Sequence, residues 1–213
     1  MSSWARWWPL TGLAFVALWV ATIFVTNDDV DSGDSDSKIL AYYAKSGNQD
    51  RHIAAFLMVL AASLLFVWFL AKLREQLMRA EGGPGTLTAL AYGAGIAAVV
   101  LWTVSLAFFA GAAFAVDDTS KFQLDPNTYR FFNDVGYVIW FSGTTVALIT
   151  VVATAVASLR TGLLPKWLTW LSFPVALTML VSFFFIPFLI MLGWILVVSV
   201  TFLLRKETPA PAA

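Results

Sequence analysis

The chain has 213 residues, of which 60% are hydrophobic and 12% are charged, and its formal net charge is zero. Soluble domains carry about 25% charged residues, so this chain has too few polar side chains to cover its apolar ones in water, and a bilayer must be its solvent. The charge balance excludes the basic surface that nucleic acid requires, and the lack of cysteine excludes disulfides, thiolate metal sites and a cysteine nucleophile.

Four separate apolar segments are typical of membrane-spanning helices, which need about 20 residues: 10–25, 53–71, 87–116 and 135–159. A fifth stretch, residues 167–204, has no charge and would be nearly twice too long as one helix, at about 1.5 Å per residue. Pro187 disfavours helix at the residue before it, so we expect a turn near residues 182–187. The sequence therefore predicts an all-α, polytopic transmembrane bundle of about six helices.

A short amphipathic helix is expected in the loop after the first span, which we take as the first outer loop. Ser35 or Asp36 can serve as its N-cap, and Gly47 would end it before the second span. Its apolar face would be formed by four residues: Ile39, Leu40, Tyr42 and Tyr43.

Breakers and caps separate the remaining spans. The run Gly-Gly-Pro-Gly at residues 82–85 should end the second span and start the third. Asp125 followed by Pro126 predicts the start of the fourth helix, because Asp caps helices and Pro suits the first helical position.

Tyr43 and Tyr129 are 86 residues apart, as are the Leu-Arg pairs at 73–74 and 159–160, which hints that helices one-two and three-four form a parallel repeat.

The distribution of basic residues predicts the orientation, because Lys and Arg favour cytoplasmic loops. Assigning loops alternately puts eight basic residues on one side (Arg6, Lys72, Arg74, Arg79, Arg160, Lys166, Arg205, Lys206) and five on the other (Lys38, Lys45, Arg51, Lys121, Arg130). The second side also holds ten of the thirteen acids. We therefore expect N-in/C-in topology, one transmembrane domain over residues 1–206, and a disordered cytoplasmic tail over 207–213. An interfacial aromatic belt at the inner end would comprise Trp7, Trp8, Trp167 and Trp170.

Metal binding and cofactors are not expected. The acidic run at residues 27–36 fails the EF-hand register, because Val30 and Ile39 would occupy ligand positions if Gly33 were the central glycine. A single histidine, His52, excludes a bis-histidine haem and a histidine-rich metal centre. We expect His52 to be a snorkelling side chain at the membrane interface; a proton-relay or ligand role is the alternative.

Catalysis is not expected either. Ser142-Gly143 is similar to part of the Gly-x-Ser-Gly motif of rhomboid intramembrane proteases, but residues 187–204 contain no histidine to act as the base that serine needs. Gly136 and Gly143 are seven residues apart and should share a face on which another helix packs closely. Asp134 is expected to pair locally with Arg130, and a substrate or proton site is the alternative reading.

The predicted spans contain no Asp, Glu, Lys, Arg or His. Buried ionisable groups usually mark ion pathways and proton-coupled transport, so their absence argues against a proton antiporter, a voltage sensor and a retinal protein. The polar groups in the spans are mainly hydroxyls, which could line a pocket for a weakly polar molecule such as a lipid. The candidates are Ser142, Thr144, Thr145 and Thr178.

The order of several segments resembles a group of uncharacterised multi-pass membrane proteins from high-GC bacteria: residues 36–43, 69–74, 80–85, 159–168 and 193–199. This resemblance implies a six-helix bundle in the bacterial inner (plasma) membrane, and it carries no catalytic residues over to this chain. The leading hypothesis is a non-catalytic protein that acts through contacts with the lipid bilayer, a membrane-protein partner or a second copy of itself. The alternative is a transporter or channel for a small or lipophilic solute.

Overall fold

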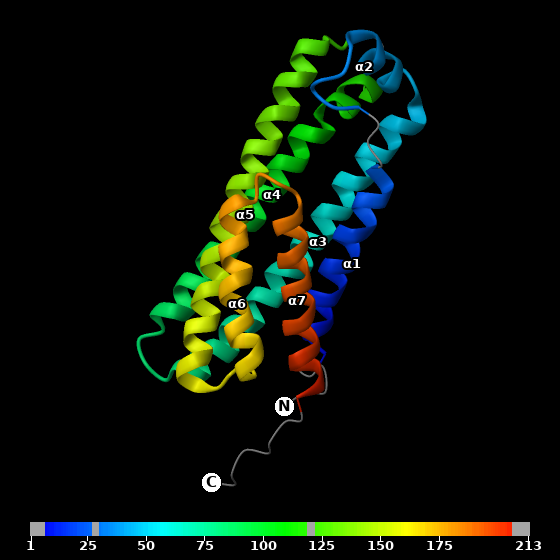
Figure 1. Cartoon of the computed structure of the whole chain (residues 1–213). Coiled ribbons are helices and arrows are strands. Elements are labelled where there is room, and N and C mark those ends of the chain that lie inside the picture. The colour runs from blue at the N-terminus through cyan, green and yellow to red at the C-terminus, as the bar shows by residue number, and fades with distance from the viewer. Residues whose placement is uncertain (1–6, 27–29, 119–121, 206–213) are drawn as a thin grey trace.

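The structure, a computed structural model, describes residues 7–26, 30–118 and 122–205, and the regular elements in these ranges are helices (Figure 1). Five are long and apolar enough to cross a membrane, and the segment Lys166–Val181 is a shorter apolar helix. The predicted all-helical chain with several potential spans is confirmed. The elements are α1 (Pro9–Thr26), α2 (Asp36–Tyr43), α3 (Ser46–Glu81), α4 (Thr86–Asp118), α5 (Pro126–Thr161), α6 (Lys166–Thr178), the 3-10 helix η2 (Met179–Val181) and α7 (Ile186–Leu204).

Three helices are much longer than the others. α3 and α5 have 36 residues each and α4 has 33, which corresponds to about 50–54 Å, whereas a bilayer's hydrocarbon core is about 30 Å thick. Figure 1 shows the turn between α6 and α7 part-way along the bundle, with α3, α4 and α5 continuing past it to the end where α2 lies. α3, α4 and α5 therefore extend well beyond the turn of the α6–α7 hairpin.

Local signals set the helix ends. α3 ends before Gly82 (φ 63°) and α5 before Gly162 (φ 70°), and this left-handed conformation costs glycine little. α5 begins at Pro126, as predicted, and the Thr128 amide donates to the Asp125 carboxylate at 2.9 Å. The chain turns between η2 and α7 as expected, but Pro187 lies in the first turn of α7 rather than in the connection.

The proposed 86-residue register of a repeat is wrong. The bounds of α3 and α5 differ by 80 residues at both ends (126 − 46 and 161 − 81). Moreover, Tyr43 belongs to the separate helix α2, whereas Tyr129 lies inside α5. A parallel repeat stays a prediction, without that register.

The two ends of the bundle differ in charge. The carboxyl ends of α3 and α5 lie at the same end of the molecule as the start of α6 (Figure 1), so the described members of the predicted cytoplasmic basic set gather there. Trp7, Trp167 and Trp170 are exposed at this end, as a belt requires, whereas Trp8 is buried against Phe69 and Phe202. Three basic residues used for orientation, Arg6, Lys121 and Lys206, and the tail 207–213 lie outside the described residues.

Aromatic rings fill the centre of the bundle. Phe15 of α1 stacks on Phe66 of α3 with a centroid distance of 4.2 Å. Trp102 of α4 is 1% exposed and lies against Phe15, Phe66, Trp19 and Phe188. We call these residues, with Trp140, the aromatic core; Trp140 of α5 joins it through Phe188, at 5.1 Å. The core thus holds five helices together.

Glu81 caps the start of α4 across the 82–85 turn. Its carboxylate accepts hydrogen bonds from the Leu87 amide at 3.1 Å and from the Thr88 amide and hydroxyl at 3.1 and 2.8 Å. The Glu81→Ala variant should unfold more easily by about 1 kcal/mol, the usual cost of losing a helix cap. Thermal unfolding in detergent measures this, and Glu75→Ala is the control, since Glu75 makes only exposed ion pairs with Lys72 and Arg79. Equal destabilisation by both changes would contradict the capping role.

Candidate functional site

A small folded unit covers one end of the bundle, and we call residues 30–45 the α2 cap. The Ser35 hydroxyl accepts a hydrogen bond from the Lys38 amide at the start of α2. α2 and α3 are separated at residues 44–45, so Gly47 lies inside α3 and does not end α2, contrary to the prediction. Leu40 is 42% exposed, which leaves Ile39 and Tyr43 as the buried side chains of α2. They form a second hydrophobic cluster with Val30, Ala113 and Tyr129.

Arg130 of α5 fastens the α2 cap to the bundle. Its guanidinium donates to the backbone carbonyls of Ser32 at 3.1 Å and Asp34 at 2.8 Å, and to the Asp36 carboxylate at 2.6 Å. The predicted local pair between Arg130 and Asp134 is therefore wrong, because Arg130 is drawn toward the cap instead. One residue earlier, the Tyr129 hydroxyl donates to the Val30 carbonyl at 3.1 Å. Two adjacent side chains of α5 thus hold a segment almost 100 positions away in sequence.

His52 lies under the α2 cap. It is 7% exposed, its Nε2 is 3.3 Å from the Tyr42 hydroxyl, and its ring lies against the Tyr43 ring at 5.7 Å. The expectation of a snorkelling interfacial side chain is wrong, because α2 folds over the start of α3. The neighbouring contacts from Asn48 and Gln49 of α3 to the carbonyls of Tyr42 and Tyr43 hold α2 in this position.

Acidification is expected to loosen this end of the molecule. The Thr128 amide and hydroxyl lower the pKa of Asp125 below its ordinary value of 3.8, and the Asp31 amide and the Lys38 ammonium lower that of Asp34. Because the pKa is lower in the folded state, the stabilisation is complete above 3.8 and is lost as the pH falls through the folded-state pKa. Amide exchange in α2, corrected for its intrinsic pH dependence, should rise below about pH 4. Exchange that stays unchanged down to pH 2 would contradict this.

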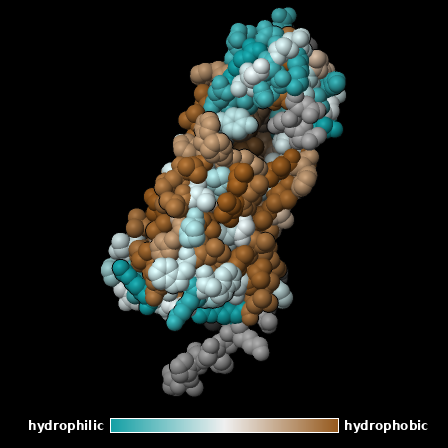
Figure 2. Space-filling model, in the orientation of Figure 1, coloured by the Kyte–Doolittle hydropathy of each residue, from teal (hydrophilic) through white to brown (hydrophobic). Residues whose placement is uncertain are grey.

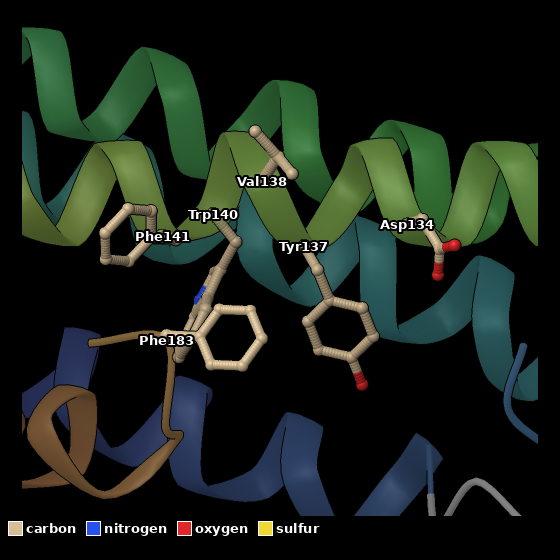
Figure 3. A pocket seen from close by; sticks show the side chains of 6 residues that line it. All are labelled: Asp134, Tyr137, Val138, Trp140, Phe141 and Phe183. Carbon is tan, nitrogen blue, oxygen red and sulfur yellow. The ribbon is translucent and has the colours of Figure 1, made fainter. Parts of the chain in front are cut away.

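A lateral pocket lies on α5 beside the α6–α7 turn. It has a volume of about 400 Å³, and its lining residues are Asp134, Tyr137, Val138, Trp140, Phe141 and Phe183. Figure 3 shows the Asp134 carboxylate and the Tyr137 phenol projecting from α5 in the same direction, with Phe183 approaching from the turn. The lateral pocket exists because the hairpin stops short, so that α5 has no neighbour from α6 or α7 beyond Phe183.

The surface around the lateral pocket is apolar. Figure 2 shows a predominantly hydrophobic band between the hydrophilic α2 cap and the hydrophilic opposite end, with a hollow just below the cap. Val138 is 62% exposed and Phe183 is 78% exposed, whereas Trp140 is 5% exposed. The pocket therefore has an open rim toward the apolar surface and a buried aromatic floor that is continuous with the aromatic core.

The six residues singled out from the sequence lie in different parts of the structure. Asp134 lines the lateral pocket, and His52 lies under the α2 cap. The Thr144 hydroxyl accepts from the Trp102 indole at 3.2 Å, and the Thr145 hydroxyl is 3.4 Å from that of Ser182. The hydroxyls of Ser142 and Thr178 donate to carbonyls of their own helices. Of the six, only Asp134 therefore lines the lateral pocket, and the hydroxyls mainly serve helix packing.

The lateral pocket has a signal in the sequence. Asp134, Tyr137, Val138 and Phe141 have the spacing i, i+3, i+4 and i+7, which places them on one face of a helix. One carboxylate on an otherwise aromatic and apolar face is unusual near a membrane span. Phe183 could not be added from the sequence, because its position depends on how far the hairpin reaches.

Comparison with known proteins yields no relative: no protein-family model, no curated protein and no solved structure matches this chain. Within the described ranges, no group of three or more His, Asp or Glu side chains is placed to hold a metal ion. The lateral pocket and the α2 cap are therefore the two features of the structure that bear on function.

Proposed function

We propose that this chain is a non-catalytic integral membrane protein that acts through contacts with lipid or with a protein partner. The lateral pocket carries this proposal. It has the size and the mainly apolar lining of a small-molecule site, and its rim residues Val138 and Phe183 are exposed on the side of the bundle. A molecule reaching it from the bilayer would not need to pass through the protein.

Six membrane crossings with both ends in the cytoplasm agree best with the helix lengths and charges. Lys166–Val181 and α7 are about 24 and 28 Å long, close to the thickness of a hydrocarbon core. The hairpin they form exposes large apolar side chains at Leu177, Leu180 and Phe184, which lipid tolerates and water does not. The basic end would face the cytoplasm, and we place the protein in a bacterial inner membrane.

The alternative, a transporter or channel, has less support. A conduction path through the bundle would have to pass the aromatic core, where Phe15, Phe66 and Trp102 are each no more than 4% exposed and in mutual contact. Acid–base catalysis is equally unsupported. His52 is enclosed by Tyr42 and Tyr43 beneath the α2 cap, near the start of α3, whereas Glu75 and Glu81 lie near the other end of that helix.

Native mass spectrometry of the purified protein tests this proposal, because it reports bound lipid directly. We expect co-purified amphiphile on the parent chain and its loss from Val138→Trp, which places a bulky ring at the rim of the lateral pocket. Val100→Trp is the matched control, because Val100 is a similarly exposed valine on α4 outside the pocket lining. Equal lipid occupancy in both variants, or no bound amphiphile on the parent, would contradict the proposal.

A further inference from the structure

The charge of the lateral pocket comes from Asp134. This residue is exposed on α5 and, among the residues that the structure describes, makes no ion pair. Its nearest cationic neighbour on the same helix, Arg130, is held by Asp36 and two backbone carbonyls of the α2 cap. Among the described residues that line the pocket there is no Lys or Arg. The rim therefore presents a carboxylate that no described basic side chain neutralises.

Besides the Asp134 carboxylate, the pocket has aromatic rings that can attract a cation. Trp140 forms the floor, and its ring packs against those of Phe185 at 5.5 Å and Phe188 at 5.1 Å. Tyr137 is held edge-on against Phe109 at 5.0 Å, and Phe183 comes from the hairpin turn. The faces of Trp, Tyr and Phe rings are electron-rich and attract cations, and such rings are the usual partners of quaternary ammonium groups.

The positions of Asp134 and Phe141 along α5 give the lateral pocket a polar edge and an apolar edge. They are seven positions apart on α5, or about 10 Å along the helix axis, and Asp134 is nearer the start of α5, which lies at the same end of the molecule as α2 (Figure 1). The polar edge of the pocket thus faces the hydrophilic end of the molecule, and its apolar edge continues into the hydrophobic band of Figure 2. An amphiphile lying along the bundle would meet the two edges in the same order.

We propose that the lateral pocket binds the head group of a cationic amphiphile: an ammonium group between the Asp134 carboxylate and the rings of Tyr137 and Trp140, with its hydrocarbon chain in the bilayer. This deepens the proposed function and rests on it. An anionic head group would be repelled by Asp134, and a neutral one would bury part of the carboxylate without compensating its lost hydration. An ammonium group compensates it and also gains from the aromatic faces.

Photo-crosslinking in a nonionic detergent tests the charge preference. The probes are a diazirine-bearing long-chain trimethylammonium amphiphile and its chain-matched uncharged alcohol, with crosslinked peptides identified by mass spectrometry. We expect crosslinks in the peptide containing residues 134–141 and an apparent affinity at least tenfold higher for the cation. Asp134→Asn should reduce that ratio to near one, whereas Asp118→Asn, which removes an exposed carboxylate at the same end of the bundle, should leave it unchanged.

The other outcomes are distinct. Equal crosslinking of both probes at residues 134–141 would overturn the cation preference while leaving lipid binding intact, and no crosslinking there by either probe would overturn both. A ratio that falls equally in Asp118→Asn would assign the preference to general surface charge and overturn the inference. Tetramethylammonium, which lacks a chain, should compete only weakly; competition as strong as that of the amphiphile would show that the chain plays no part and would also overturn it.

Discussion

Replacement of Trp102 by alanine is expected to lower the stability of the folded bundle by about 3–5 kcal/mol, the usual cost of removing a large buried aromatic side chain. Trp102 has the largest side chain among those with less than 2% exposure, and it contacts rings from α1, α3 and α7. Its removal would leave a cavity where the helices meet and strip the Thr144 hydroxyl of its donor. The measurement is the thermal unfolding midpoint of the purified protein in a mild detergent.

Two variants show whether packing is the cause. Trp68→Ala removes the same side chain from a position on α3 that is 59% exposed, and it should change the midpoint little. Thr144→Val keeps the shape of this buried side chain but removes its hydroxyl, which accepts from the Trp102 indole and donates to the Trp140 carbonyl, and it should cost about 1 kcal/mol. If Trp68→Ala were as damaging as Trp102→Ala, burial in the aromatic core would not explain the loss.

Replacement of Arg130 by methionine should release the α2 cap while leaving the spanning helices folded. Methionine keeps much of the apolar stem but removes the donors to Ser32, Asp34 and Asp36. A hydrogen bond from a charged group contributes about 1.5–3 kcal/mol to stability. The ion pair with Asp36 contributes less, because Asp36 is exposed. Hydrogen exchange should therefore accelerate at least tenfold in residues 30–45 and stay unchanged in α7.

Arg51→Met provides the matched control, because Arg51 lies at the same end of the bundle but is exposed. It should leave exchange in residues 30–45 unchanged. Faster exchange throughout the bundle in Arg130→Met would mean that the α2 cap is not a separate unit. Unchanged exchange in the cap would mean that the cluster of Val30, Ile39 and Tyr43 holds it without the guanidinium.

The features that could be predicted from the sequence are those set within a few residues of chain. Gly82 and Gly162 end helices, and Asp125 with Pro126 starts one, because caps and left-handed glycines depend on local backbone chemistry. The spacing of Gly136 and Gly143 correctly indicated close helix packing: a Cβ would lie 2.9 Å from Phe109 at the first position and 3.0 Å from Leu101 Cβ at the second, both on α4.

The features that could not be predicted depend on distant segments. Arg130 has an acid one turn away on its own helix, yet it binds a loop 94 to 98 positions earlier, because the cap is folded against α5. His52 is polar and follows two charged residues, which favours exposure, but α2 lies over it. The short helix in the first loop was predicted, but its packing against the bundle was not, and its cluster with Ala113 and Tyr129 makes it part of the fold.

Polar groups have two uses in this protein. The hydroxyls of Thr144 and Thr150 bond to the neighbouring helix α4 and fix its position, which is a common use of polar side chains between membrane helices. Asp134 differs from them, because it stands at an apolar surface and the adjacent Arg130 is engaged elsewhere. That difference is why the lateral pocket, rather than the hydroxyls of the spans, is the better place to look for a ligand.

The membrane topology is the central claim, and thiol labelling of single-cysteine variants tests it most directly. The chain has no cysteine, and a Cβ at Gly47, beside the α2 cap, meets no other atom, while one at Gly83, in the opposite turn, meets only the Glu81 carbonyl at 3.8 Å. In bacterial spheroplasts, Gly47→Cys should react with an impermeant maleimide and Gly83→Cys should react only after lysis. The reverse pattern, or labelling of both positions before lysis, would contradict a bundle that carries its α2 cap outside and its basic end in the cytoplasm.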